Sequence, residues 1–211
     1  MFDYISSLPK VELHVHLVGS ASVDTVLELA RRHPERGVPT ERDALVTFYE
    51  FTDFAHFIDV YVKVTRLLTS GSDITALVDG LAADLASNAV RYAEVTVTPS
   101  SHLLLGIEPD ELAEALTVGR AAARERHGVE LAWVFDIAGS LGYDEGIATA
   151  EWVLRHRPEG TVAFGWAVTR SACRATCSAN RSTWPATAVC ISCRMREKRP
   201  VRRRSGPHCA T

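Results

Sequence analysis

Short β-type runs alternate with longer helical patterns along the first 165 residues of the 211-residue chain. The β-type runs are residues 11–17, 91–98, 130–137 and 161–164. Helical patterns fill the segments between them, at residues 22–32, 40–68, 73–86, 109–127 and 143–156. Because a strand, a crossover helix and the next strand form a parallel unit, this order predicts an α/β fold built on a parallel sheet.

The order of elements fits two architectures. Four βα units suit either the N-terminal half of a (β/α)8 TIM-type barrel or a doubly wound sheet. A dinucleotide-binding doubly wound domain carries G-x-G-x-x-G after its first strand, and residues 17–22 contain only one glycine, Gly19. We therefore expect the half-barrel.

Cap and turn residues set the expected limits of the elements. Ser22 and Asp73 are expected to cap helix N-termini, Pro99 to stop the second strand, and Gly128 to end the helix that Pro109 opens. Along the first strand, alternation places four apolar side chains on one face: Val11, Leu13, Val15 and Leu17.

Two histidines lie two residues apart on this first strand, within residues 8–19 (LPKVELHVHLVG). His14 and His16 therefore point to the same side, near the carboxyl end of the strand, where barrel enzymes place their sites. Two neutral imidazoles one pleat apart suit a Zn²⁺ ion. An isolated H-x-H is also common by chance, and a core or surface histidine is the alternative. The patterned strand and the glycine directly behind it favour ligands.

The run LPKVELHVHL followed by Gly-Ser resembles the N-terminal signature of adenosine deaminases, which are amidohydrolase-type (β/α)8 barrels. RYAEVTVTP resembles the second strand of that family and VAFG the start of its fourth, so the similarity covers about residues 8–165. The resemblance implies that His14 and His16 bind a catalytic Zn²⁺ together with a third His and an Asp from later strands. It also implies attack of hydroxide on C6 of a purine nucleoside while a Glu protonates the ring.

Four residues are expected to contact the nucleoside by the same resemblance. Phe54 and Phe57 resemble the apolar lid over the base, although core packing explains such aromatics equally well. Gly19 and Val18 follow the histidines, and family members commonly place an acidic residue at the position of Val18, where it accepts a hydrogen bond from the 5′-hydroxyl. Valine cannot accept one, which indicates a 5′-substituted adenosine such as aminodeoxyfutalosine. Another residue supplying that contact is the alternative.

The other histidines and two strand carboxylates receive a plainer interpretation. His33, His56, His102, His127 and His156 lie in helices or at their ends among polar residues, and we expect them at the surface. Asp136 and Glu94 lie on strands, where they are either pocket groups or members of a structural network.

The composition changes abruptly at Trp166. Residues 1–165 contain 13 Lys and Arg, 25 Asp and Glu and no Cys, whereas residues 166–211 contain 10 Lys and Arg, one acidic residue and all five Cys. The tail shows neither helical nor strand periodicity. We therefore expect a partial deaminase barrel at 1–165 and a disordered tail at 166–211.

Three interpretations of the tail are open. Cys173, Cys177, Cys190 and Cys193 have spacings compatible with a zinc ribbon, but apolar and turn residues to fold one are few. The arginines at 202–204 are compatible with nucleic-acid binding, as in a two-domain binding protein. A frameshift explains more of the tail than the other two interpretations. If the codons are suitable, one base added after codon 165 changes the encoded sequence to Gly-Leu-Gly-Gly-Asp-Glu. The same frame then yields Pro-His-Ala-Gly-Glu, which resembles the family segment with the third zinc His and the catalytic Glu.

The resulting expectation is a zinc-dependent purine-nucleoside deaminase, with another metallohydrolase on the same barrel as a rival. Its expected partner is a small purine nucleoside and not nucleic acid. No apolar run reaches about 18 residues and no secretory signal is visible, so we expect no membrane span and a cytoplasmic location. The catalytic Glu and the remaining ligands would lie beyond residue 165. We therefore expect these 211 residues alone to be inactive and of low stability.

Overall fold

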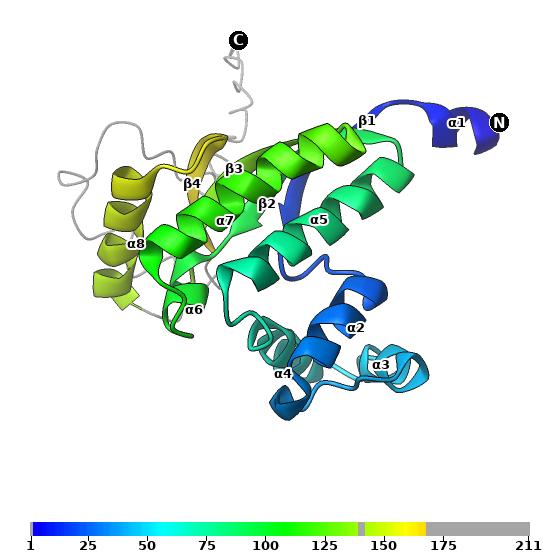
Figure 1. The fold of residues 1–211 in the computed structure, drawn as a ribbon, viewed down its shortest axis with the longest axis horizontal. Helices are drawn as coiled ribbons and strands as arrows, with labels where there is room; N and C mark the ends of the chain where they lie inside the picture. The colour runs from blue at the N-terminus through cyan, green and yellow to red at the C-terminus, as the bar shows by residue number, and fades with distance from the viewer. Residues whose placement is uncertain (1, 139–141, 168–211) are drawn as a thin grey trace, which may run out of the picture.

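The computed structural model describes residues 2–138 and 142–167, which form one parallel sheet with helices packed against it (Figure 1). The strands are β1 (Lys10–His16), β2 (Val90–Val97), β3 (Glu130–Ala138) and β4 (Thr161–Ala167). They are hydrogen-bonded in the order β1-β2-β3-β4, and every pair is parallel. This order follows the sequence without reversal, as in half of a (β/α)8 barrel, whereas a doubly wound sheet reverses its order.

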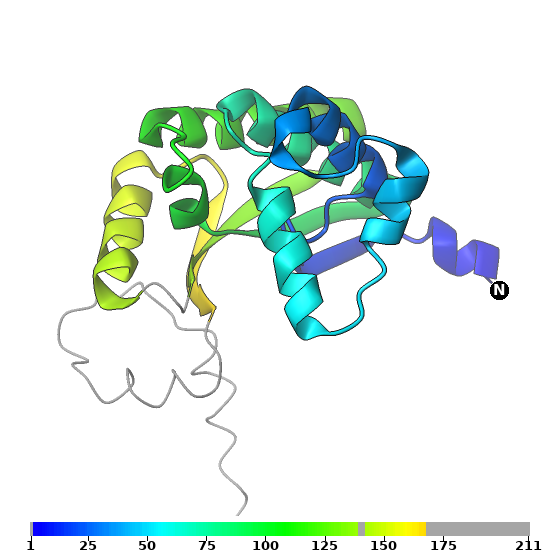
Figure 2. The same cartoon turned by 90° about the horizontal axis from the view of Figure 1, so that it is seen from below.

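Three long helices cover one face of the sheet (Figures 1 and 2). They are α5 (Gly71–Ser87), α7 (Pro109–Ala122) and α8 (Gly142–His156). A short π-helical segment, Ala123–His127, continues α7, and Gly128 ends it with a φ of 65°. A positive φ at this position is the reason for a glycine there, as the sequence predicted.

The remaining helices lie before the strands or in their connections. They are α1 (Phe2–Ser7), α2 (Val23–Arg32), a 3₁₀ turn (Pro34–Arg36), α3 (Arg42–Phe48), α4 (Phe54–Thr65) and α6 (Pro99–Leu103). The helical insertion expected at 40–68 is thus two separate helices. The sequence patterns do not predict α1, and at Pro99 they predict only the end of the second strand. Pro99 also opens α6, because proline suits the first turn of a helix.

One of the two predicted helix caps is confirmed and the other is wrong. The Ser22 side chain accepts a hydrogen bond from the Thr25 amide, as an N-cap does. Asp73 does not cap α5; Ser70 does, by accepting from the Asp73 amide. The Asp73 carboxylate lies one turn inside, where it accepts hydrogen bonds from Thr69, Ser70 and His33. Ser and Asp three residues apart form a reciprocal cap, and the first of the two is the N-cap.

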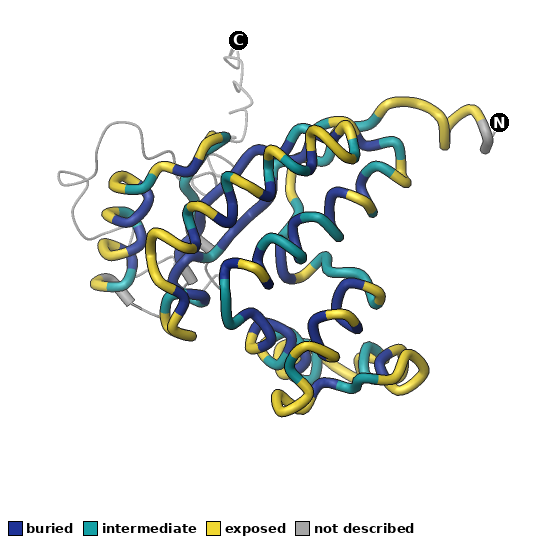
Figure 3. Tube along the Cα trace, in the orientation of Figure 1, coloured by how far each residue is buried: buried dark blue, intermediate teal, exposed yellow. Residues whose placement is uncertain are grey.

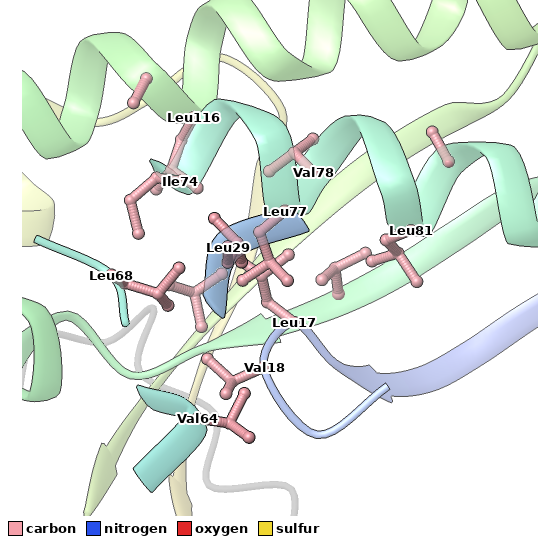
Figure 4. Close-up of a cluster of buried hydrophobic side chains, with 14 of the residues drawn as sticks. Leu17, Val18, Leu29, Val64, Leu68, Ile74, Leu77, Val78, Leu81 and Leu116 are labelled. Atoms are coloured by element: carbon pink, nitrogen blue, oxygen red, sulfur yellow. The ribbon is translucent and has the colours of Figure 1, made fainter. Parts of the chain in front are cut away.

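The core lies between the sheet and its helices (Figures 3 and 4). Leu17, Leu29, Leu77 and Leu116 are each at most 1% exposed, and they bring together the end of β1 and helices α2, α5 and α7. Trp133 and Phe135 on β3 are fully buried on the helix side, where Phe135 contacts Trp152 of α8 at 5.4 Å between ring centroids.

The apolar face predicted for the first strand is only partly buried. Leu17 is buried and Val15 half-buried, but Val11 and Leu13 are 63% and 60% exposed. The physical reason is that β1 lies at the edge of the sheet with β2 as its single neighbour among the described strands. A closed barrel covers both flanks of every strand, so these two side chains mark where the sheet is open.

None of the helices within the described ranges is both long and apolar enough to cross a bilayer.

Candidate metal and nucleoside site

His14 and His16 lie on the sheet face opposite the helices. His16 is in register with Thr96, and Thr96 with Val134. Because residues aligned across parallel strands share a face, and Val134 alternates with the helix-facing Trp133 and Phe135, the His16 side chain points away from the helices. The His14 and His16 ring centroids are 5.2 Å apart. The pair therefore faces the interior of the curved sheet near its carboxyl edge.

The environment of His16 favours the neutral imidazole. Burial lowers its pKa below 6.5, and the charge of His14 lowers it further, while the Asp136 carboxylate acts in the opposite direction. Neutral imidazole is the form that binds a metal. This half-buried ring therefore has the protonation state that a zinc ligand requires.

Hydrogen bonds fix the turn that follows the histidines. The Leu17 amide donates to the Thr96 carbonyl at 2.9 Å, which extends the pairing of β1 and β2. The Ser20 amide and hydroxyl both donate to the His16 carbonyl, at 3.0 and 2.7 Å. A Cβ added at Gly19 would lie 3.4 Å from the His16 Cβ and 3.7 Å from Tyr61 Cε2. Gly19 thus lies between the end of β1 and helix α4.

A hollow of about 200 Å³ opens beside this turn. Its walls are residues 18–21 on one side and, on the other, aromatic or β-branched side chains of α4 and of the segment between α3 and α4: Tyr49, Phe51, Phe57, Val60, Tyr61 and Val64. Figure 4 shows Val18 beside Val64 of α4. The walls contain no charged side chain, so the hollow suits an apolar or aromatic group.

The structure brings together three of the four residues predicted to contact the nucleoside. Val18, Gly19 and Phe57 line the hollow. Phe54 is 76% exposed and does not line it, although its ring centroid lies 5.9 Å from that of Phe57. Tyr61 belongs to the same wall, and the sequence analysis does not predict it as a contact. Its position four residues after Phe57, on the same side of α4, was the available signal.

Asp136 is a buried carboxylate on the same face of the sheet as the histidines. It is 5% exposed, and its Oδ1 accepts a hydrogen bond of 2.5 Å from the Thr98 hydroxyl. Burial raises the pKa of Asp136, while the Thr98 hydrogen bond and the charges of His16 and His14 partly offset this. The sequence leaves a pocket group and a network member as alternatives for Asp136, and its hydrogen bond from Thr98 is compatible with both. Glu94 accepts a hydrogen bond from Tyr92 at 3.2 Å.

No third ligand joins the pair within residues 2–138 and 142–167. Clusters of three or more His, Cys, Asp or Glu that could hold a metal ion do not occur there. A zinc site needs about four donors, so the described residues supply two of them. The cysteines at 173–193 and the expected third His, Asp and Glu lie outside the described residues.

The prediction that the other histidines lie at the surface is wrong for His102 and incomplete for the rest. His102 is 1% exposed because α6 packs against β3 and α8. His33, His127 and His156 are half-buried, and each lies 3.0 Å from a carboxylate oxygen, of Asp73, Asp79 and Asp110 respectively. Polar sequence neighbours signalled exposure, whereas tertiary packing decided burial.

Together, a parallel half-barrel and a histidine pair on the inner face of its first strand define the class of metal-dependent hydrolases built on (β/α)8 barrels. Residues 9–179 match the family model described as adenosine deaminase. The chain therefore belongs to the adenosine deaminase family. The match extends past the boundary predicted at residue 165, and β4 likewise continues to Ala167.

Relatives and solved structures agree with this assignment. The chain is 47% identical over 164 residues to an aminodeoxyfutalosine deaminase of Streptomyces coelicolor and 44% identical over 167 residues to one of Streptomyces avermitilis. These matches cover 77% and 78% of this chain but 42% and 47% of the relatives, so the chain spans less than half of their length.

The fold is similar to that of solved deaminases. An adenine deaminase from Arthrobacter aurescens matches with a TM-score of 0.69 at 22% identity, over 77% of this chain and 50% of that one. An amidohydrolase from Burkhoderia ambifaria with bound zinc matches with a TM-score of 0.69 at 26% identity, over 80% and 46%. The predicted α/β half of a TIM-type barrel is confirmed.

Proposed function

We propose that this chain carries half of the active site of a zinc-dependent enzyme that hydrolytically deaminates a 6-aminopurine nucleoside. The observation that carries the proposal is the His14–His16 pair facing the interior at the carboxyl edge of the sheet, beside an apolar hollow. Because the chain belongs to the adenosine deaminase family, the chemistry that we assign to this geometry is hydrolytic deamination. The ligand is then a small nucleoside and not a nucleic acid, and the enzyme works in the cytoplasm.

His14 and His16 fit a zinc ion by donor type and protonation. Both are imidazoles on one face, and burial keeps His16 neutral. Zinc held there would supply the Lewis acidity that makes water nucleophilic near neutral pH. The chain's own residues bind and orient: Phe57 and Tyr61 offer aromatic surface to the base, and the turn at Gly19 keeps the backbone close to the histidines.

The preferred substrate is a 5′-substituted adenosine such as aminodeoxyfutalosine. Val18 is 7% exposed in the wall of the hollow and cannot accept a hydrogen bond from a 5′-hydroxyl. A buried hydroxyl left without a partner loses affinity, whereas an apolar substituent gains by contact with Val18 and Val64. Two relatives at 44–47% identity are aminodeoxyfutalosine deaminases, which supports this choice of substrate.

A polypeptide of these 211 residues alone is expected to have no turnover. The described residues offer two metal ligands, and no carboxylic acid joins the pair in a metal-binding cluster. We further propose that the missing groups are encoded in a shifted frame after codon 165, which contains Pro-His-Ala-Gly-Glu. The polypeptide read in that frame is called the frame-restored protein below.

Absorbance measurement of purine deamination tests the proposal. The 211-residue polypeptide and the frame-restored protein are each assayed with zinc on aminodeoxyfutalosine, adenosine and adenine. We expect turnover only in the frame-restored protein, with aminodeoxyfutalosine as the best substrate. Failure of the frame-restored protein on all three, with a cooperative melt showing that it is folded, would sink the proposed function.

A further inference from the structure

The sheet register places Asp136 one pleat nearer the mouth than His16. His16 aligns with Thr96 and Thr96 with Val134, so Thr98 and Asp136 lie two residues farther along their strands and on the same face. Two residues of a strand rise by about 6.6 Å. Asp136 therefore lies beyond the histidine pair, on the side from which a ligand would enter.

Open space adjoins this carboxylate. Asp136 is in register with Gly165 of β4, and a Cβ built at Gly165 would meet no atom of the described residues within 4 Å. A glycine beside open space on a strand allows a ligand to approach the backbone closely. Burial raises the pKa of the Tyr61 phenol, and the charge of the Asp136 carboxylate raises it further, so Tyr61 of the hollow lies within the electrostatic influence of Asp136. Asp136 thus adjoins the space over Gly165 and acts electrostatically on a residue of the hollow.

The chemistry of Asp136 fits a hydrogen-bond acceptor for a ligand. It belongs to no metal-ligating cluster within the described part of the chain. Thr98 holds Oδ1 at 2.5 Å and is the one side chain in the described ranges that donates to this carboxylate. When the base of a nucleoside lies in the apolar hollow or at the histidines, the hydrogen-bond donors that remain for Asp136 are the sugar hydroxyls.

We propose that Asp136 is a specificity-determining residue that accepts a hydrogen bond from the 2′- or 3′-hydroxyl of the nucleoside bound over Gly165. The proposal rests on the proposed function, because it takes the ligand to be a nucleoside. It assigns to Asp136 the recognition of the sugar, which Val18 does not provide. Thr98 is a positioning residue that fixes the orientation of the carboxylate.

Equilibrium binding of inosine, 2′,3′-dideoxyinosine and 5′-deoxyinosine to the zinc-supplemented full chain at about 10 °C tests the proposal. The wild type should bind inosine about 10- to 100-fold more tightly than the analogue that lacks the recognised hydroxyl, as expected for a hydrogen bond to a charged group. Asp136→Ala should bind inosine and that analogue equally. Thr98→Val should show an intermediate ratio.

Asp73→Asn is the matched control, because Asp73 is also a buried carboxylate, at 2% exposed, but lies at the start of α5. It should lower the melting temperature and leave the ratio of affinities unchanged. If Asp136→Ala retains the wild-type ratio, the assignment of Asp136 is wrong and the proposed function is unaffected. If the folded frame-restored protein binds none of the three nucleosides, both proposals are wrong. If Asp136→Ala melts too early in the 211-residue chain, the same series is repeated on the frame-restored protein. There we expect Asp136→Ala to raise KM more than it lowers kcat.

Discussion

The buried imidazole of His102 is expected to destabilise the folded chain as the pH falls. The side chain is 1% exposed, its Nδ1 has no hydrogen-bond partner among the described residues, and burial lowers its pKa to about 4. An unfolded chain exposes a histidine with a pKa of about 6.5. Between these two values the unfolded state binds a proton that the folded state does not. The free energy of unfolding therefore decreases as the pH falls through this window.

The pKa difference sets the size of this effect. About 2.5 pH units corresponds to roughly 3 kcal/mol below pH 4, and to about 2 kcal/mol at pH 5 relative to pH 7.5. Urea denaturation at pH 7.5, 6 and 5 measures it. His102→Leu should remove the part of the pH dependence that comes from His102. Leu104→Ala, at the exposed C-cap of the same helix, should retain it. Equal pH dependence in wild type and His102→Leu would refute the reasoning.

Three further predictions concern the substrate, a helix contact and the gene. Val18→Asp in the frame-restored protein should shift the kcat/KM preference toward adenosine by about 1–3 kcal/mol, the scale of one buried hydrogen-bond mismatch; a wild-type preference for adenosine would contradict the account of Val18. Gly80→Ala should lower the free energy of unfolding by about 1–3 kcal/mol in urea denaturation, because overpacking destabilises a fold. The added Cβ would lie 2.1 Å from Thr25 Oγ1, where α5 packs against α2. DNA sequencing around codon 165 should reveal a shifted frame that stays open and encodes Pro-His-Ala-Gly-Glu; a stop within a few dozen codons in both other frames would show that the frameshift idea is wrong.

The fold was predictable because local patterns and tertiary structure agree in most of this chain. Alternation in residues 11–17 and the β-type run at 91–98 located two strands, and Gly128 located a helix end through its positive φ. Two errors came from choices that local pattern does not determine. Both Ser70 and Asp73 are good caps, and only the backbone shows which lies first. Val11 and Leu13 are apolar, but their burial depends on a neighbouring element.

From residue spacing alone, without the family resemblance that indicated Phe57, the site was predictable only where one strand holds it. His14 and His16 are two residues apart, so alternation alone placed both rings on one face. The hollow joins residues 18–21 to helix α4, about 40 positions later, and no sequence period encodes that distance. The relation of Asp136 to Thr98 and Gly165 likewise depends on the register between strands.

Zinc dependence of the His14–His16 pair is tested most directly by measuring metal content and deamination on the same preparation of the frame-restored protein. We predict one zinc per chain and turnover of aminodeoxyfutalosine that is lost on chelation and regained with zinc. His14→Gln combined with His16→Gln should lose both the metal and the turnover, whereas His56→Gln, on helix α4, should keep both. Undiminished turnover by the metal-free protein, or by the double variant, would contradict the assignment.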